Sequence, residues 1–256
     1  MPLLRRSGVG IHYDVHGEHS ERPPLLLSHG FSASAHMWDA NVPALCDERR
    51  VVTWDMRGHA RSEAPPSAGE YSVEQSVGDM CALLDVLGSP RAVLGGMSLG
   101  GYLSLAFHLR HPERVAALIL VDTGPGFRRD EPREEWNAFA ERRAAALDRD
   151  GVSALSPGRE VAEHPDAAGL AHTARRVMAQ FDASVIDSLP SIGVPTLVVV
   201  GSLDTNFLSA AEYMAAKIPG ARKVVLEGAG HAANIDAAEA FNAAAGEFLQ
   251  TTEEAP

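Results

Sequence analysis

The sequence predicts an α/β protein with a mostly parallel central sheet flanked by helices. Short apolar runs recur along the chain, and each is followed by a turn and by apolar residues at helical spacing. Runs that are apolar on both faces are typical of parallel strands covered by helices. The chain has 256 residues, 45% hydrophobic and 22% charged, which is enough for one large globular domain. Strands that alternate with helices indicate a doubly wound sheet.

The expected strands are the apolar runs themselves. The segment that follows the second run shows the helical spacing, with Val77, Met80, Cys81, Leu84 and Leu87 on one side. The opening segment, 3–15, contains two glycines at its centre and is expected to form an antiparallel hairpin at the sheet edge. The six apolar runs are 24–28, 50–55, 92–96, 117–122, 195–201 and 222–227.

One segment interrupts this alternation. Residues 125–192 contain no strand-like run but two helical patterns. We expect these helices to form a cap over the carboxyl edge of a core made of residues 1–124 and 193–256, with most of their apolar residues packed on that core. The apolar residues are Trp136, Phe139, Ala140 and Leu147 in the first pattern, and Leu170, Ala174, Val177, Met178 and Phe181 in the second.

Composition excludes several classes of protein. The formal net charge of −12 argues against nucleic-acid binding, which usually requires a basic face. No segment approaches the roughly 18 apolar residues of a membrane span, and the first residues are too poor in apolar side chains for a secretory signal. We therefore expect a cytoplasmic protein with no nucleic-acid or membrane partner. The sequence carries no indication of the oligomeric state.

A nucleophile is predicted at Ser98. The segment Gly96-Met97-Ser98-Leu99-Gly100 matches the pattern G-x-S-x-G and lies between an expected strand and an expected helix. A serine at such a sharp turn projects its hydroxyl above the sheet, and the residues two before and two after it must be small because the chain passes close to them. The helix that follows directs free N–H groups at the reacting centre.

A serine hydroxyl needs a base, and the base needs a carboxylate. His231 lies in a glycine-flanked loop directly after the last expected strand, and histidine has the matching pKa. Asp204 follows the preceding strand, which gives the chain order Ser, Asp, His. Asp122 is the alternative acid because it ends an earlier strand at the same edge; otherwise it would cap the turn at 123–124.

Acyl transfer also needs N–H donors for the developing oxyanion. Ser28-His29-Gly30-Phe31 follows a strand at a suitable place, so we expect the N–H groups of Phe31 and Leu99 to form the oxyanion hole. His29 is expected to hold this loop in place. His164 and His172 lie in the predicted cap and are candidate substrate contacts. His108 and His111 have a spacing that could suit a metal, but no third ligand accompanies them, so we predict no metal site.

These residues carry a resemblance that extends over nearly the whole chain. The sequence resembles the α/β-hydrolase superfamily, in the branch with His-Gly-Phe after the third strand. Trp38 matches as well, and the segment 55–62 resembles the motif D-x-R-G-H-G-x-S, with Ala60 in place of the usual glycine. This substitution puts the backbone angles of the loop in question rather than the chemistry.

The resemblance implies a Ser-His-Asp mechanism without metal or organic cofactor. A serine at position 98 disfavours dehalogenases and epoxide hydrolases, which have aspartate there, and Met97 departs from the asparagine typical of carbon–carbon bond hydrolases. What remains is the esterase, lactonase and perhydrolase group, with a small-molecule ester or lactone as substrate. The candidates for an apolar substrate pocket are Met97, Trp136, Phe139, Met178 and Phe181.

Three functions stay open on the sequence alone. The first is a carboxylesterase that acts on small or medium apolar esters. The second is an enol-lactonase-like enzyme that acts on a carboxylated lactone, for which Arg128 and Arg129 of the cap are the first candidates to bind the substrate carboxylate. The third is a ligand-sensing or partner-binding protein that retains the fold with low turnover.

Overall fold

The computed structural model describes residues 2–155, 164 and 166–252. Within this part of the chain, eight strands form one sheet in the order β1-β2-β4-β3-β5-β6-β7-β8. Strands β3 to β8 are parallel, and the antiparallel pair β1–β2 forms one edge, as the sequence predicts. The predicted strand bounds agree with the structure to within two residues. The strands are β1 Leu3–Arg6, β2 Val9–His16, β3 Leu25–Ser28, β4 Val51–Trp54, β5 Ala92–Met97, β6 Val115–Val121, β7 Thr196–Gly201 and β8 Arg222–Leu226.

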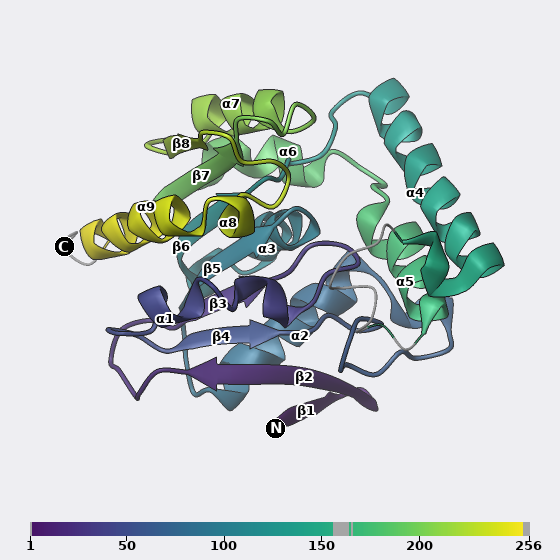
Figure 1. Cartoon of the computed structure of the whole chain (residues 1–256), viewed down its shortest axis with the longest axis horizontal. Coiled ribbons are helices and arrows are strands. Elements are labelled where there is room, and N and C mark those ends of the chain that lie inside the picture. Colours follow the sequence, from purple (N-terminus) through teal and green to yellow (C-terminus); the bar gives the residue numbers. More distant parts are fainter. Residues whose placement is uncertain (1, 156–163, 165, 253–256) are drawn as a thin grey trace.

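Helices cover both faces of this sheet (Figure 1). Alternate residues of one strand pack on different helices: Leu26 of β3 belongs to the cluster with α2, α3 and α7, whereas Leu25 and Leu27 belong to the cluster with α1 and α9. This alternation explains why the central strands are apolar at every position. The helices outside the segment between β6 and β7 are α1 Val42–Leu45, α2 Val73–Val86, α3 Leu99–Arg110, α7 Leu208–Lys217, α8 Ala233–Asp236 and α9 Ala238–Thr251.

The described residues of the segment between β6 and β7 form helices joined by loops, and none of them lies in a strand. The segment contains α4 Asp130–Asp150, α5 Ala167–Thr173, a π-helix at Ala174–Met178 and α6 Ser184–Ser188. Helices α4 and α5 lie side by side (Figure 1), and α4 buries Ala140, Ala144 and Leu147 at helical spacing. Residues 156–163 and 165 of the predicted cap lie outside the described residues. No described helix combines the length and the apolar character that a membrane crossing requires.

Candidate active site

Three side chains far apart in the sequence meet at the carboxyl edge of the sheet. Ser98 directly follows β5, Asp204 lies three residues beyond β7, and His231 lies five residues beyond β8. Parallel strands end at one edge, so loops from different parts of the chain converge there. The fold therefore supplies a serine, a carboxylate and an imidazole to one small region.

The backbone at Ser98 is in an unusual conformation. Its φ is 52° and its ψ is −115°, which non-glycine residues rarely adopt. The turn is so tight that a Cβ added to Gly96 would lie 2.2 Å from the carbonyl group of Gly100, and a Cβ at Gly100 would lie 2.3 Å from the carbonyl oxygen of Ser28. Only glycine fits at these two positions, as expected from the sequence.

The three side chains form a hydrogen-bonded chain. Oδ2 of Asp204 lies 2.7 Å from Nδ1 of His231, and Nε2 of His231 lies 3.2 Å from Oγ of Ser98. The carboxylate of Asp204 is 3% exposed, whereas the imidazole of His231 is 46% exposed. This geometry lets the carboxylate fix the imidazole with a proton on Nδ1, which leaves Nε2 free to accept the serine proton.

An aromatic ring also holds the imidazole of His231. Phe207 stacks on it, with 4.9 Å between ring centroids and an interplanar angle of 23°. The backbone N–H of Phe207 donates to the carbonyl oxygen of Asp204. Phe207 and Asp204 therefore belong to the same turn. No local pattern predicts this contact, because nothing in the loop after β7 indicates which ring the histidine will face.

Asp122, the alternative acid, has other partners. Its two carboxylate oxygens accept hydrogen bonds from the backbone N–H groups of Gly201, at 2.9 Å, and Ala233, at 2.8 Å. Burial raises the pKa of Asp122 to about 6, although these two N–H donors act in the opposite direction. Asp122 therefore ties the end of β7 to the segment after His231. It does not cap the local turn at 123–124.

The loop after β3 lies directly beside Ser98. A Cβ added to Gly30 would lie 2.8 Å from Sδ of Met97 and 3.5 Å from Cβ of Ser98. Leu99 is the first residue of α3, so its N–H has no partner within the helix. Phe31 and Leu99 thus lie on the two segments that flank Ser98, and the assignment of their N–H groups to an oxyanion hole stays a prediction.

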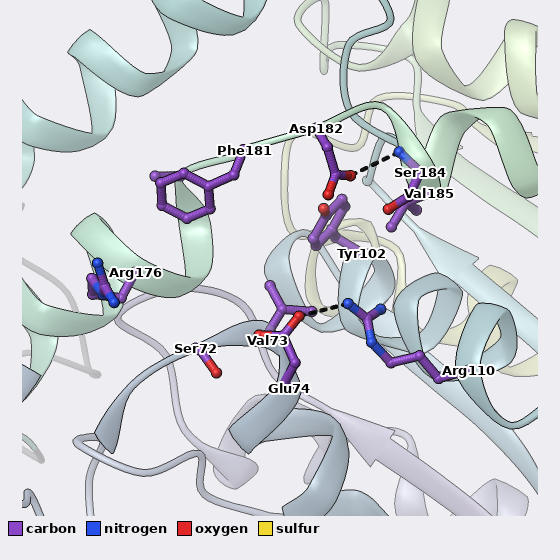
Figure 2. Close-up of a pocket in the computed structure, with 11 residues that line it drawn as sticks. Ser72, Val73, Glu74, Tyr102, Arg110, Arg176, Phe181, Asp182, Ser184 and Val185 are labelled. Carbon is purple, nitrogen blue, oxygen red and sulfur yellow. Dashed lines mark hydrogen bonds and ion pairs between the residues drawn. The ribbon is translucent and has the colours of Figure 1, made fainter. Parts of the chain in front are cut away.

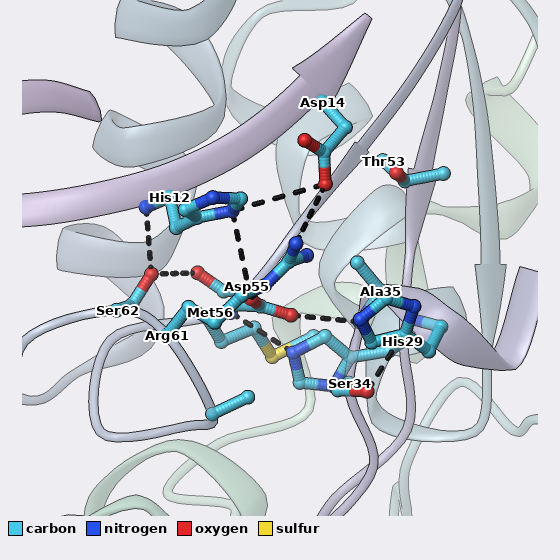
Figure 3. A network of polar contacts seen from close by, with 12 residues as sticks. His12, Asp14, His29, Ser34, Ala35, Thr53, Asp55, Met56, Arg61 and Ser62 are labelled. Atoms are coloured by element: carbon cyan, nitrogen blue, oxygen red, sulfur yellow. Dashed lines mark hydrogen bonds and ion pairs between the residues drawn. The ribbon is translucent and has the colours of Figure 1, made fainter. Parts of the chain in front are cut away.

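His29 holds the loop that contains Phe31. Its Nε2 accepts from the N–H of Met56 at 2.9 Å, and its Nδ1 lies 2.7 Å from the carbonyl oxygen of Gly30. Figure 3 shows the surrounding network, in which Asp55 accepts from the N–H of Ala35 and pairs with Arg61. His29 is fully buried and lies between two loops, in agreement with the structural role expected from the sequence.

Ala60 occupies the position at which the related motif has glycine. Its φ is 43°, so an alanine adopts the left-handed conformation that glycine adopts most easily. The residue is buried, and its N–H donates to Nδ1 of His164 at 3.1 Å. The surrounding contacts thus hold a backbone conformation that alanine alone would disfavour.

The five predicted pocket residues have different surroundings in the structure. The ring centroids of Trp136 and Phe139 lie 5.5 Å apart, and Nε1 of Trp136 donates to the carbonyl oxygen of Met178. Met178 itself is buried among the helices between β6 and β7. Met97 is buried in the core cluster on the sheet face of α1 and α9. Trp136 and Phe139 of α4 and Met178 therefore lie together, whereas Met97 lies in a different core cluster.

Phe181 lines a separate cavity. This cavity has a volume of about 270 Å³ and lies beside Tyr102 of α3 (Figure 2). Phe181 is 66% exposed. Glu74 and Arg110, which form an ion pair with each other, also line the cavity. Neither Ser98 nor the other two members of the hydrogen-bonded chain lines the cavity.

The arginines near the site differ from those expected. Arg128 pairs with Asp187 at 2.6 Å, so its charge already has a partner. Arg143 of α4 instead lies over the ring of Phe31, with 5.7 Å from its guanidinium carbon to the ring centroid, and over Phe139 at 5.6 Å. Among the described residues, no carboxylate forms an ion pair with Arg143. Sequence reasoning missed this residue because its relation to Phe31 depends on how α4 packs.

His108 and His111 do not form part of a cluster of ligands. His108 is buried in α3, and the ring of His111 packs against Phe107. Within residues 2–155, 164 and 166–252, no group of three His, Cys, Asp or Glu side chains is arranged to hold a metal ion.

Several proteins similar to this chain are named as hydrolases. The chain is 30% identical to the curated protein named "Putative carbamate hydrolase RutD" from Caulobacter sp. (strain K31), over 94% of this chain and 96% of that protein. It superposes on the enol-lactonase from Burkholderia xenovorans LB400 with a TM-score of 0.79 and 31% identity, over 97% and 100% of the two chains. For a thermophilic esterase from Thermogutta terrifontis the TM-score is 0.81 and the identity 30%, over 98% and 97%.

The family model described as "alpha/beta hydrolase fold" matches residues 23–165, more than half of the chain. This range begins just before β3 and includes the loop of Phe31, the segment 55–62 and the turn at Ser98. The sheet order and the position of the site at its carboxyl edge agree with that match. The chain belongs to the α/β-hydrolase family.

Proposed function

We propose that the protein is a serine hydrolase that cleaves carboxylic ester bonds through an acyl-enzyme intermediate. The observation that carries this proposal is the hydrogen-bonded chain from Asp204 through His231 to Ser98. The names of the three related proteins support it, because carbamates, enol-lactones and esters all contain a carbonyl carbon bonded to a heteroatom leaving group.

The proposed reaction has two halves. His231 accepts the proton of the Ser98 hydroxyl as the oxygen attacks the ester carbonyl, and the N–H groups of Phe31 and Leu99 stabilise the oxyanion. The intermediate collapses when His231 gives that proton to the leaving alcohol, which leaves Ser98 acylated. A water molecule then attacks the acyl group with His231 again as base, and release of the acid restores the serine. Asp204 orients the imidazole and stabilises its charged form throughout.

The first test is the release of p-nitrophenol from acyl esters of two to twelve carbons. We expect turnover by the wild type and a loss of roughly 10⁴-fold or more in kcat for Ser98→Ala, as removal of a triad serine usually causes. The preferred chain length would report the size of the acyl site. Ser98→Ala activity within about tenfold of wild type would refute the assignment. No turnover by folded wild type would favour a specialised lactonase or the ligand-sensing role.

A second candidate is an enol-lactonase-like activity on a carboxylated substrate. Arg143 favours it, because this guanidinium lies over the ring of Phe31 and no described carboxylate pairs with it. A substrate carboxylate at this position would gain a charge-assisted hydrogen bond.

The test compares a neutral ester with one of the same length that ends in a carboxylate. Arg143→Met should lower kcat/KM at least tenfold for the acidic ester alone. Arg128→Met serves as the control, because Arg128 is already paired with Asp187. Equal effects of Arg143→Met on both esters would remove the support for an acidic substrate.

A further inference from the structure

Ser32, the residue after Phe31, has a strained backbone. Its φ is 58°, in the left-handed region that serine seldom occupies. A conformation of this kind persists only where the surroundings determine it. Ser32 directly follows Phe31, whose N–H group is one of the two donors of the proposed oxyanion hole.

Three buried histidines hold three consecutive peptide groups of this loop. His29 bonds to the carbonyl oxygen of Gly30, whose peptide group contains the N–H of Phe31. His59 accepts the N–H of Ser32 at 3.3 Å, and Nε2 of His164 lies 2.9 Å from the carbonyl oxygen of Ser32. We call His29, His59 and His164 the histidine cluster; its rings are 5.0 Å and 5.6 Å apart.

The other nitrogen of each ring is held by the segment 55–62. His29 accepts the N–H of Met56, and His164 accepts the N–H of Ala60, while Nδ1 of His59 lies 3.3 Å from the carbonyl oxygen of Arg57. A ring nitrogen that accepts a backbone N–H carries no proton, so the opposite nitrogen of a neutral ring must donate. His164 therefore donates from Nε2 to Ser32.

The third member of the cluster comes from a different part of the fold. His29 and His59 belong to core loops after β3 and β4, whereas His164 lies in the segment between β6 and β7, 132 residues from Ser32. With both ring nitrogens bonded to backbone groups and only 4% of the residue exposed, His164 has no free atom with which to bind a substrate. Its candidate role as a substrate contact therefore has no geometric support.

We propose that His164 is a positioning residue of the oxyanion hole, which couples the docking of the segment between β6 and β7 to the rate of the chemical step. This inference rests on the proposed function, because it requires that the N–H of Phe31 stabilise the oxyanion. Without the His164 hydrogen bond, Ser32 is released toward an ordinary conformation, and the peptide group that contains the N–H of Phe31 loses its fixed orientation.

The kinetic test uses His164→Ala and His164→Gln on the ester that the wild type prefers. Loss of one oxyanion donor typically costs 10²–10³ in kcat, so a misdirected donor in His164→Ala should cost about 10–100-fold with KM within twofold. Glutamine can still donate a hydrogen bond from a similar position, so His164→Gln should recover at least part of that loss. A rise in KM with unchanged kcat would instead make His164 a substrate contact and overturn the proposal.

The control is Arg175→Ala. Arg175 lies in the same segment, where it pairs with Glu141 and Asp148 of α4, so its loss loosens the packing of the segment without removing a contact to the loop of Phe31. We expect kcat within twofold of wild type for this variant. An equal fall in kcat for Arg175→Ala and His164→Ala would show that general loosening of the segment is responsible and would contradict a specific role.

A second measurement does not depend on activity. Hydrogen exchange should become faster in His164→Ala for the peptide that covers residues 29–35, with unchanged exchange in β5 and β6. If the wild type proves inactive on esters, the proposed function fails, yet this measurement still decides whether His164 holds the loop. Unchanged exchange at 29–35 would refute that.

Discussion

Asp122 and Asp204 follow neighbouring strands, yet their carboxylates have different partners. Asp204 bonds to a ring nitrogen of His231, whereas Asp122 accepts two backbone N–H groups, one from the end of β7 and one from the start of α8. A charge that must stabilise an imidazolium belongs next to the ring. A charge bonded to two backbone donors stabilises the fold around the site. At the scale of single residues, the two aspartates therefore have separable effects.

Replacement by asparagine should separate them. Asp204→Asn should lower kcat about 10³–10⁴-fold, because an amide neither fixes the imidazole nor stabilises its charge. Asp122→Asn leaves one N–H without its acceptor, which should cost about 1–3 kcal/mol of unfolding free energy, with kcat within tenfold of wild type. Ester kinetics and urea unfolding on both variants measure this. A larger loss of kcat in Asp122→Asn would transfer the role of the acid to Asp122.

Single residues also show what sequence reasoning could and could not find. Ser98, Asp204 and His231 can be predicted as one site because each follows an apolar run in a set order, and the structure brings the three side chains within hydrogen-bond distance. The hydrogen bond of His164 to Ser32, and the stacking of Phe207 on His231, have no local pattern, since each depends on how distant loops meet. The positive φ of Ser32 was equally hidden, because serine at that position carries none of the signal that glycine would.

At the scale of elements, the segment 55–62 joins α2 to the loops around the site. Arg57 forms a bidentate ion pair with Asp79 of α2, at 2.8 Å and 2.7 Å, and both side chains are almost fully buried. Arg6 of β1 also reaches Asp79, at 3.0 Å. A buried pair of this kind is costly to break, since removal of one partner leaves the other charge without compensation.

Asp79→Ala should therefore lower the unfolding free energy by about 3–5 kcal/mol. The matched control is Asp85→Ala in the same helix, because the carboxylate of Asp85 is mostly exposed and its pair with Arg114 should contribute no more than about 1 kcal/mol. Urea denaturation of both variants is the measurement. Equal effects would show that the Arg57–Asp79 pair does not anchor the segment.

The elements themselves were largely predictable. Central strands are apolar on both faces, so their runs mark them to within two residues, and α2 buries Val77, Met80 and Leu84 as its spacing indicates. The two helical patterns of the segment 125–192 also appear, as α4 and as α5 with the π-helix. What could not be predicted is how these helices pack, because an apolar stripe does not specify its partner. The grouping of the five predicted pocket residues depends on this packing and stays a prediction.

At the scale of the whole molecule, buried histidines should make stability depend on pH. Burial, with the nearby His29 and His164, lowers the pKa of His59 well below its ordinary value, and burial also lowers the pKa values of His12 and His108. The unfolded chain then binds more protons than the folded one below about pH 6.5. The unfolding free energy should fall as the pH falls through that value.

His59 alone should lower the unfolding free energy by up to about 1.4 kcal/mol for each pH unit below that value. Asp122 acts with the opposite sign, because its raised pKa lets the folded protein keep a proton that the unfolded chain releases between about 3.8 and 6. Three histidines should outweigh this one carboxyl. Urea unfolding at pH 7.5, 6.5 and 5.5 measures the balance, and equal or greater stability at pH 5.5 would contradict it.

Ser98 is the nucleophile of the proposed reaction, and intact-mass measurement after treatment with a fluorophosphonate tests this assignment most directly. This reagent phosphonylates only a serine whose proton is taken by a base. We predict one adduct per chain, located by peptide mapping at Ser98, absent in Ser98→Ala and formed at least a hundredfold more slowly in His231→Ala. An adduct at another serine, or equal labelling of Ser98→Ala, would contradict the assignment of the nucleophile.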